Sequence, residues 1–162
     1  MSNSKINTIE ISGASLSQIA SHPLKRERET ALNDIIKDNF FEPKDDNSGP
    51  YDLKLSIEDG RLVIYMKNAL GKSLNTLILS IKPYKRLIQD YFIMIQSYES
   101  ARHEGNRERL EAIDMGRRGI HNEGAELFME RLKDKVAMDV KTARRLFTLI
   151  CALNKNNLIL SR

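Results

Sequence analysis

Cysteine is almost absent from this chain of 162 residues, which contains a single one, Cys151. One thiol cannot form an internal disulfide or a multi-cysteine zinc site, and it fits a reducing compartment. Long apolar runs are also absent: residues 91–95 form one of the longest, far below the roughly 20 residues of a membrane-spanning helix. The N-terminal sequence MSNSKINTIEISG has no apolar signal-peptide core. We therefore expect a cytoplasmic protein with no membrane contact.

A large excess of one charge sign is missing too, because 26 basic and 22 acidic residues leave a net charge of +4. Most of the asymmetry lies in residues 136–162, where Lys141, Arg144 and Arg145 form a basic patch. Interleaved charge of this kind is usually a solvated face. Nucleic-acid binding is therefore disfavoured, although weak backbone binding by this patch stays open.

The length and composition are those of one globular domain. With 41% apolar and 30% charged residues, the chain is neither disordered nor low in complexity. A chain of this size buries roughly 70% of the surface that its unfolded form exposes. We expect residues 1–162 to form a single α+β domain, with residues 154–162 as a candidate C-terminal tail.

A small antiparallel sheet is predicted in the first half of the chain. Asp59-Gly60 separates two runs in which apolar and polar residues alternate, which is the strongest short-range signal for a β-hairpin. A third run, residues 74–81, extends the hairpin into a meander. Ile9 and Ile11 alternate with polar neighbours in a further short strand. The prediction is an antiparallel β-meander of three to four strands.

Helical spacing of apolar residues predicts about five amphipathic helices around this sheet. The first follows Ser21-His22-Pro23, and the second opens at Lys82-Pro83 and is expected to be the central core helix. Gly105-Asn106 ends the second helix and caps the third. The third and fourth helices flank residues 113–124, and Asp139 or Thr142 caps the last one.

The segment IDMGRRGIHNEG, residues 113–124, departs from ordinary patterning because it combines three glycines with many functional side chains. An unbroken helix through it would lose about 3 kcal/mol relative to alanine at these positions, which favours a break near Gly119. A helix restarting there would direct free N–H groups toward an anion. The predicted ligand-binding residues are Arg117, Arg118, His121 and Asn122.

Two other interpretations of this segment remain open. If the helix is continuous, Arg117 lies in an apolar seam and requires a buried partner, for which Asp114 or Glu111 is one or two turns away. In a catalytic interpretation, His121 acts as a general base oriented by Asp114 or Glu123, and the arginines hold an anionic substrate.

Cofactor and metal signatures are absent from the sequence. There is no Walker loop, no GxGxxG after a strand, no HExxH and no GxSxG. His22 and His103 do not pair with a second histidine at ligand spacing. We expect no metal and no cofactor, and we leave open whether the protein is an enzyme.

Several segments together resemble a known bacterial family. They are EAIDMGRRGIHNEGAELFMERL (111–132), TARRLFTLIC (142–151), GPYDLKLSIEDGRLV (49–63) and KRLIQDYFIMIQSYESA (85–101). They are similar to the uncharacterised protein family 0262 over roughly residues 22–154. The resemblance implies a bacterial cytoplasmic protein and brings no activity, cofactor or catalytic residue.

The favoured function is a non-enzymatic binding or regulatory protein. Its expected ligand is a phosphate-bearing or acidic group, or another protein chain, including a second copy of this one. The alternative is a small enzyme that acts on an anionic substrate with His121 as general base.

Overall fold

The computed structural model describes residues 3–12 and 22–153, so the candidate tail at 154–162 lies outside the described residues. In that part of the chain the protein is α+β, with four α-helices, one short 3₁₀ helix, a four-stranded sheet and a two-stranded sheet. The elements are β1 (Ile6–Ile11), α2 (His22–Lys37), β2 (Phe41–Pro43), β3 (Tyr51–Glu58), β4 (Arg61–Lys67), β5 (Leu77–Ser80), η1 (Lys82–Tyr84), α3 (Lys85–Glu104), α4 (Arg107–Leu132), β6 (Val136–Met138) and α5 (Val140–Leu153).

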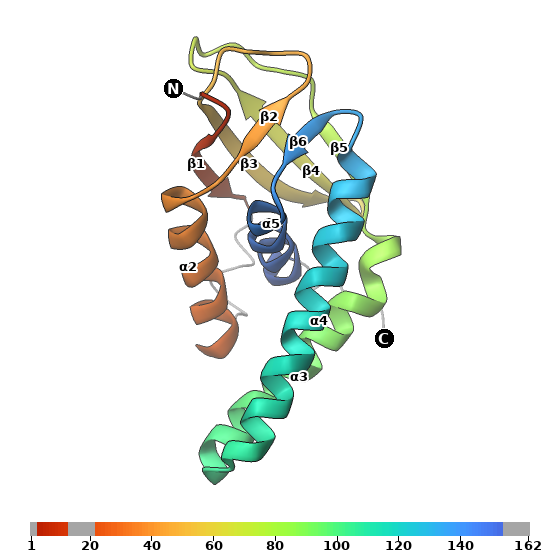
Figure 1. The fold of residues 1–162 in the computed structure, drawn as a ribbon. Helices are drawn as coiled ribbons and strands as arrows, with labels where there is room; N and C mark the ends of the chain where they lie inside the picture. The colour runs from red at the N-terminus through yellow and green to blue at the C-terminus, as the bar shows by residue number, and fades with distance from the viewer. Residues whose placement is uncertain (1–2, 13–21, 154–162) are drawn as a thin grey trace.

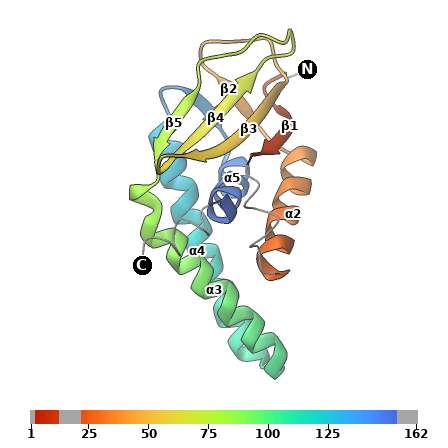
Figure 2. The same cartoon turned by 180° about the vertical axis from the view of Figure 1, so that it is seen from behind.

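The predicted meander is confirmed as β3–β4–β5, joined by antiparallel pairing. Asp59 and Gly60 both have positive φ, at 54° and 73°, as a two-residue hairpin turn requires. On β3, Leu53 and Leu55 are buried and alternate with the exposed Lys54. This alternation gives the sheet one apolar face, which the helices cover (Figures 1 and 2).

The fourth strand, β1, corrects the prediction of a purely antiparallel sheet. It pairs with β3 in parallel, from Ile6 beside Tyr51 to Ile11 beside Leu55. Two parallel neighbours need a crossover connection, because a tight turn can join only antiparallel strands. Here α2 lies in the connection between the two strands. The strand order is therefore β1–β3–β4–β5.

The central helix is α5, and the prediction that the helix after Lys82-Pro83 is central was wrong. Nine residues of α5 are buried, and it packs against both α2 and α4. Figures 1 and 2 show it below the sheet, between those two helices. Helix α3 instead packs mainly on α4. The most apolar helix therefore occupies the position with neighbours on every side.

The predicted break near Gly119 was also wrong, since α4 is one helix of 26 residues. This is why the described chain has four α-helices rather than about five. The cap predictions around it are confirmed: Gly105 is left-handed with φ 69°, and Asn106 accepts a hydrogen bond from the Arg109 backbone at 3.1 Å. Packing against α3 and α5 offsets the helix-propensity cost of the glycines.

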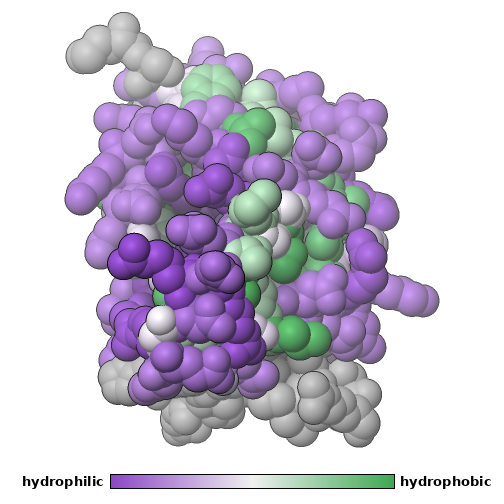
Figure 3. Space-filling view, turned by 60° about the horizontal axis from the view of Figure 1, so that its bottom comes forward, coloured by the Kyte–Doolittle hydropathy of each residue, from purple (hydrophilic) through white to green (hydrophobic). Residues whose placement is uncertain are grey.

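Two further features were not predicted. Phe41–Pro43 and Val136–Met138 form a small antiparallel sheet, β2–β6, and the far ends of α3 and α4 project from the body as an antiparallel pair (Figure 1). None of the described helices is long and apolar enough to cross a membrane. Hydrophilic side chains dominate the face shown in Figure 3. The hydropathy of this face therefore does not single out a functional site, and the side-chain contacts described below are used to locate one.

Candidate functional site

A cavity of about 130 Å³ lies where α2, α4 and α5 face one another. Each helix contributes residues three or four positions apart, which places them on one face. The helix α2 supplies Glu27, Thr30, Ala31 and Asp34, α4 supplies Arg117 and His121, and α5 supplies Arg144, Arg145 and Thr148. Three arginines and two carboxylates therefore surround one small space.

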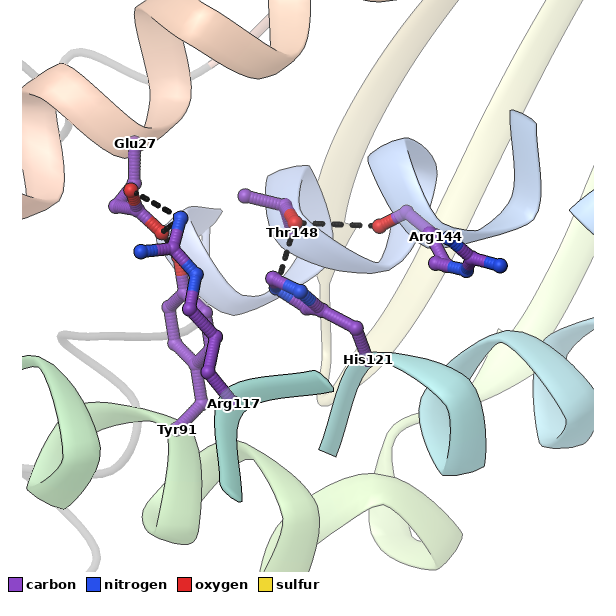
Figure 4. Close-up of polar contacts among 6 residues, drawn as sticks. All are labelled: Glu27, Tyr91, Arg117, His121, Arg144 and Thr148. Carbon is purple, nitrogen blue, oxygen red and sulfur yellow. Dashed lines mark hydrogen bonds and ion pairs between the residues drawn. The ribbon is translucent and has the colours of Figure 1, made fainter. Parts of the chain in front are cut away.

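Arg117 is held by a carboxylate on another helix. Its Nη2 donates to both carboxylate oxygens of Glu27 at 2.7 Å, and the two side chains are 30% and 19% exposed. The Tyr91 hydroxyl of α3 donates to the same carboxylate at 3.1 Å. Burial raises the pKa of Tyr91 well above its usual value, so this hydroxyl keeps its proton. The network links three helices (Figure 4).

His121 is a neutral imidazole in contact with α5. Burial, followed by the positive charges of Arg117 and Arg144, lowers its pKa from 6.5 to about 4. Its Nε2 lies 3.3 Å from the Thr148 hydroxyl oxygen, and that hydroxyl donates to the Arg144 carbonyl at 3.1 Å. Threonine has one hydroxyl proton, so while that proton is donated to the Arg144 carbonyl, the shared bond with His121 requires the hydrogen on Nε2.

The predicted basic patch separates into three different environments. Lys141 lies 3.7 Å from the Asp38 carboxylate. Arg145 donates to the backbone oxygens of Asp34 and Asp38 at 3.2 and 2.7 Å. These partners lie at the end of α2. The guanidinium of Arg144 makes no hydrogen bond or ion pair within the described residues, whereas its backbone carbonyl accepts from Thr148.

The four predicted binding residues lie on two sides of α4. Arg117 and His121 are four residues apart and line the cavity, whereas Arg118 and Asn122 are exposed. Arg118 lies 3.8 Å from Asp114. Adjacent residues of an α-helix are rotated by about 100° around its axis, so neighbours such as Arg117 and Arg118 face different directions. Because α4 is continuous, the four residues do not form one cluster, as the predicted break would have allowed.

The two candidate orienting carboxylates do not contact His121. Asp114 is paired with Arg118, and Glu123 accepts a hydrogen bond from Arg86 of α3 at 3.0 Å. Thr148 takes the orienting position instead. Sequence reasoning missed Glu27, Asp34 and Thr148, although the recurrence of 27, 31 and 34 at helical spacing marks one face of α2.

No metal site accompanies this cavity. Among residues 3–12 and 22–153, no group of three or more histidine, cysteine or acidic side chains could hold an ion. A second hollow of about 470 Å³ lies between the end of α4 and β6. Its lining is mostly apolar: Met129, Val136, Ala137, Met138 and Val140, with Glu126, Glu130 and Lys133. The smaller cavity is the candidate site because charged groups from three helices converge there.

The fold and the cavity define an α+β protein with a small charged space between three helices. The sequence matches the uncharacterised protein family UPF0262 over residues 3–156, and the chain belongs to that bacterial family. A UPF0262 protein of Caulobacter vibrioides is 46% identical over 152 residues, covering 94% of each chain. One of Agrobacterium fabrum is 46% identical over 130 residues, covering 80% of this chain and 83% of its own. No solved structure matches the chain.

Arg117→Ala is expected to lower the free energy of unfolding by about 1–2 kcal/mol, because it leaves the Glu27 carboxylate half-buried without its cation. Full burial would give about 3–5 kcal/mol, and solvent reduces this value. Arg118→Ala, the neighbour with an exposed ion pair, should cost less than about 0.5 kcal/mol. Urea denaturation of both variants measures the difference. Equal effects would contradict the bridging role of Arg117.

Proposed function

We propose that this protein is a non-enzymatic binding protein that recognises a small anion in the cavity between α2, α4 and α5. The observation that carries the proposal is Arg144, which lines the cavity and whose guanidinium makes no hydrogen bond or ion pair within the described part of the chain. The other two arginines are already engaged by Glu27 and by backbone oxygens. Arg144 is the cation that remains for a ligand.

The chemistry of the neighbouring groups supports an anionic ligand group. Arginine donates several parallel N–H bonds and suits phosphate and carboxylate oxygens. Figure 4 shows Arg144 and Arg117 on opposite sides of His121. Both cations act on the imidazole strongly enough to lower its pKa. The positive potential at the cavity therefore extends across His121, where an anion would be stabilised.

The size of the cavity limits the ligand. Pockets for drug-sized molecules span roughly 300–1,000 Å³, and this one has about 130 Å³. It therefore accommodates a small metabolite or one polar group of a larger molecule. The proposal includes a cytoplasmic location, which is consistent with a single, buried and reduced cysteine.

Binding without turnover is preferred over a reaction catalysed by His121. A pKa of about 4 makes the imidazole a weak base, whereas an efficient general base has a pKa near the working pH. Thr148 is a neutral partner and would stabilise an imidazolium less than a carboxylate does. These features suit a fixed hydrogen-bonding group better than a proton carrier.

Titration with inorganic phosphate in a phosphate-free buffer tests the proposal. Backbone amide resonances of residues around 117–121 and 144–148 should shift, and Arg144→Ala should weaken binding by roughly tenfold or more. A hydrogen bond to a charged group contributes about 1.5–3 kcal/mol, and 1.4 kcal/mol corresponds to tenfold.

Arg118→Ala is the matched control, because it removes an arginine from the exposed side of the same helix. It should bind phosphate as the native protein does. Loss of binding in Arg118→Ala with no loss in Arg144→Ala would place the anion on the exposed side of α4 and overturn the proposal. Absence of any binding of either phosphate or acetate at millimolar concentration would do so as well.

A further inference from the structure

We propose that the ligand of this cavity is a zwitterion, which offers its anionic group to Arg144 and a protonated amine to Asp34. This inference rests on the proposed function, because it takes the cavity as the binding site. It adds that one wall of the cavity selects positive charge while another selects negative charge.

Asp34 carries the argument for the second charge. Its side chain lines the cavity, whereas its backbone oxygen accepts hydrogen bonds from Arg145 and from the Asp38 backbone N–H. Its carboxylate forms no ion pair or hydrogen bond with the residues that the structure describes. Glu27, which lies seven residues earlier on the same face of α2, is in contrast fully used by Arg117 and Tyr91. Glu27 therefore holds Arg117 and Tyr91, whereas the Asp34 carboxylate is available to a ligand.

The unpaired charges stand on different helices, Asp34 on α2 and Arg144 on α5. Both face the same cavity of about 130 Å³, yet no ion pair joins them. Opposite charges that share a small space attract each other strongly when water is displaced. A molecule that carries both complementary charges can neutralise both walls at once, which a simple anion cannot do.

A simple anion also meets a repulsive group in this cavity. Like charges at close range disfavour binding, so the Asp34 carboxylate lowers the affinity for phosphate or acetate alone. An ammonium group placed near Asp34 converts this repulsion into attraction. The neutral His121 adds no charge at neutral pH, so the balance depends on Asp34, on Arg144 and on Arg145, whose bonds to backbone oxygens leave its charge in place. The shared chemistry is that of an α-amino acid or an aminoalkyl phosphate.

Matched probes separate the two charges. Isothermal titration with O-phosphoethanolamine against inorganic phosphate, and with glycine against acetate, compares each anion with and without an ammonium group. In the native protein the ammonium-bearing member of at least one pair should bind about tenfold more tightly. The pair in which this holds identifies whether phosphate or carboxylate is the anionic group.

Asp34→Asn should abolish this advantage, because the amide keeps the size of the side chain and removes its charge, while binding of the simple anion should stay equal or improve. Asp38→Asn, at the end of the same helix and outside the cavity, is the control and should keep the advantage. Equal affinity for both members of each pair, or an advantage that survives in Asp34→Asn, would overturn the inference. Binding of phosphate with no ammonium preference leaves the proposed function standing, whereas failure of every probe refutes both.

Discussion

Gly124→Ala is expected to lower the free energy of unfolding by up to about 2 kcal/mol, the opposite of what helix propensity predicts. An alanine Cβ at this position would lie 2.6 Å from the ring of Phe147. That ring is fully buried, so it cannot move without displacing α5. Overpacking of this kind costs about 1–3 kcal/mol or more and exceeds the roughly 1 kcal/mol that alanine gains in a helix.

Gly119→Ala is the matched control on the same helix. Apart from the adjacent residues and the local backbone of the helix, no atom lies within 4 Å of a Cβ built at Gly119, so the variant should gain about 1 kcal/mol of stability. Thermal and urea denaturation of the two variants should therefore give shifts of opposite sign. Shifts of the same sign would mean that α4 and α5 do not cross closely at Gly124.

His121 is expected to make stability fall with acidity. The pKa of the imidazole is about 4 in the folded protein and near 6.5 in an unfolded chain. Between these values the unfolded state binds the extra proton, so the free energy of unfolding decreases as the pH falls through this window. The loss amounts to about 2 kcal/mol between pH 7 and pH 5, and it is absent above pH 7.

His121→Gln removes this proton-binding group and should flatten the same part of the pH profile. Carboxylates also titrate below pH 5, so the measured quantity is the difference between variant and native protein in urea denaturation at pH 7, 6 and 5. His103→Gln, which replaces an exposed histidine near the end of α3, should keep the native profile. An unchanged profile in His121→Gln would show that the imidazole titrates normally in the folded protein.

Local signals in the sequence predicted the elements that depend on near neighbours. Asp59-Gly60 places two positive-φ residues side by side, and Gly105-Asn106 ends one helix and caps the next. Each of these depends on a few consecutive residues, whose conformational preferences act before any packing. The hairpin and both caps are confirmed for that reason.

The site depended on distant contacts, and the sequence could not show them. In the continuous-helix interpretation, Asp114 or Glu111, which lie within two turns, were the candidate partners of Arg117, but its partner Glu27 is 90 residues away. The glycines of residues 113–124 predicted a break because helix propensity alone penalises them. The packing of α4 on α3 and α5, which offsets this penalty, is not visible in the sequence. At Gly124 the missing side chain is explained only by Phe147 of another helix. Spacing alone does not reveal which helices cross.

The three walls of the cavity come from segments that lie far apart in the chain, at 27–34, 117–121 and 144–148. Such a site cannot persist in a partly folded form, because release of α2 alone removes both carboxylates. The cavity therefore belongs to the complete native state and is lost on subglobal unfolding. A molecule bound there contacts both α2 and α5, the first and last helices that the structure describes. Its binding therefore opposes the separation of these two helices.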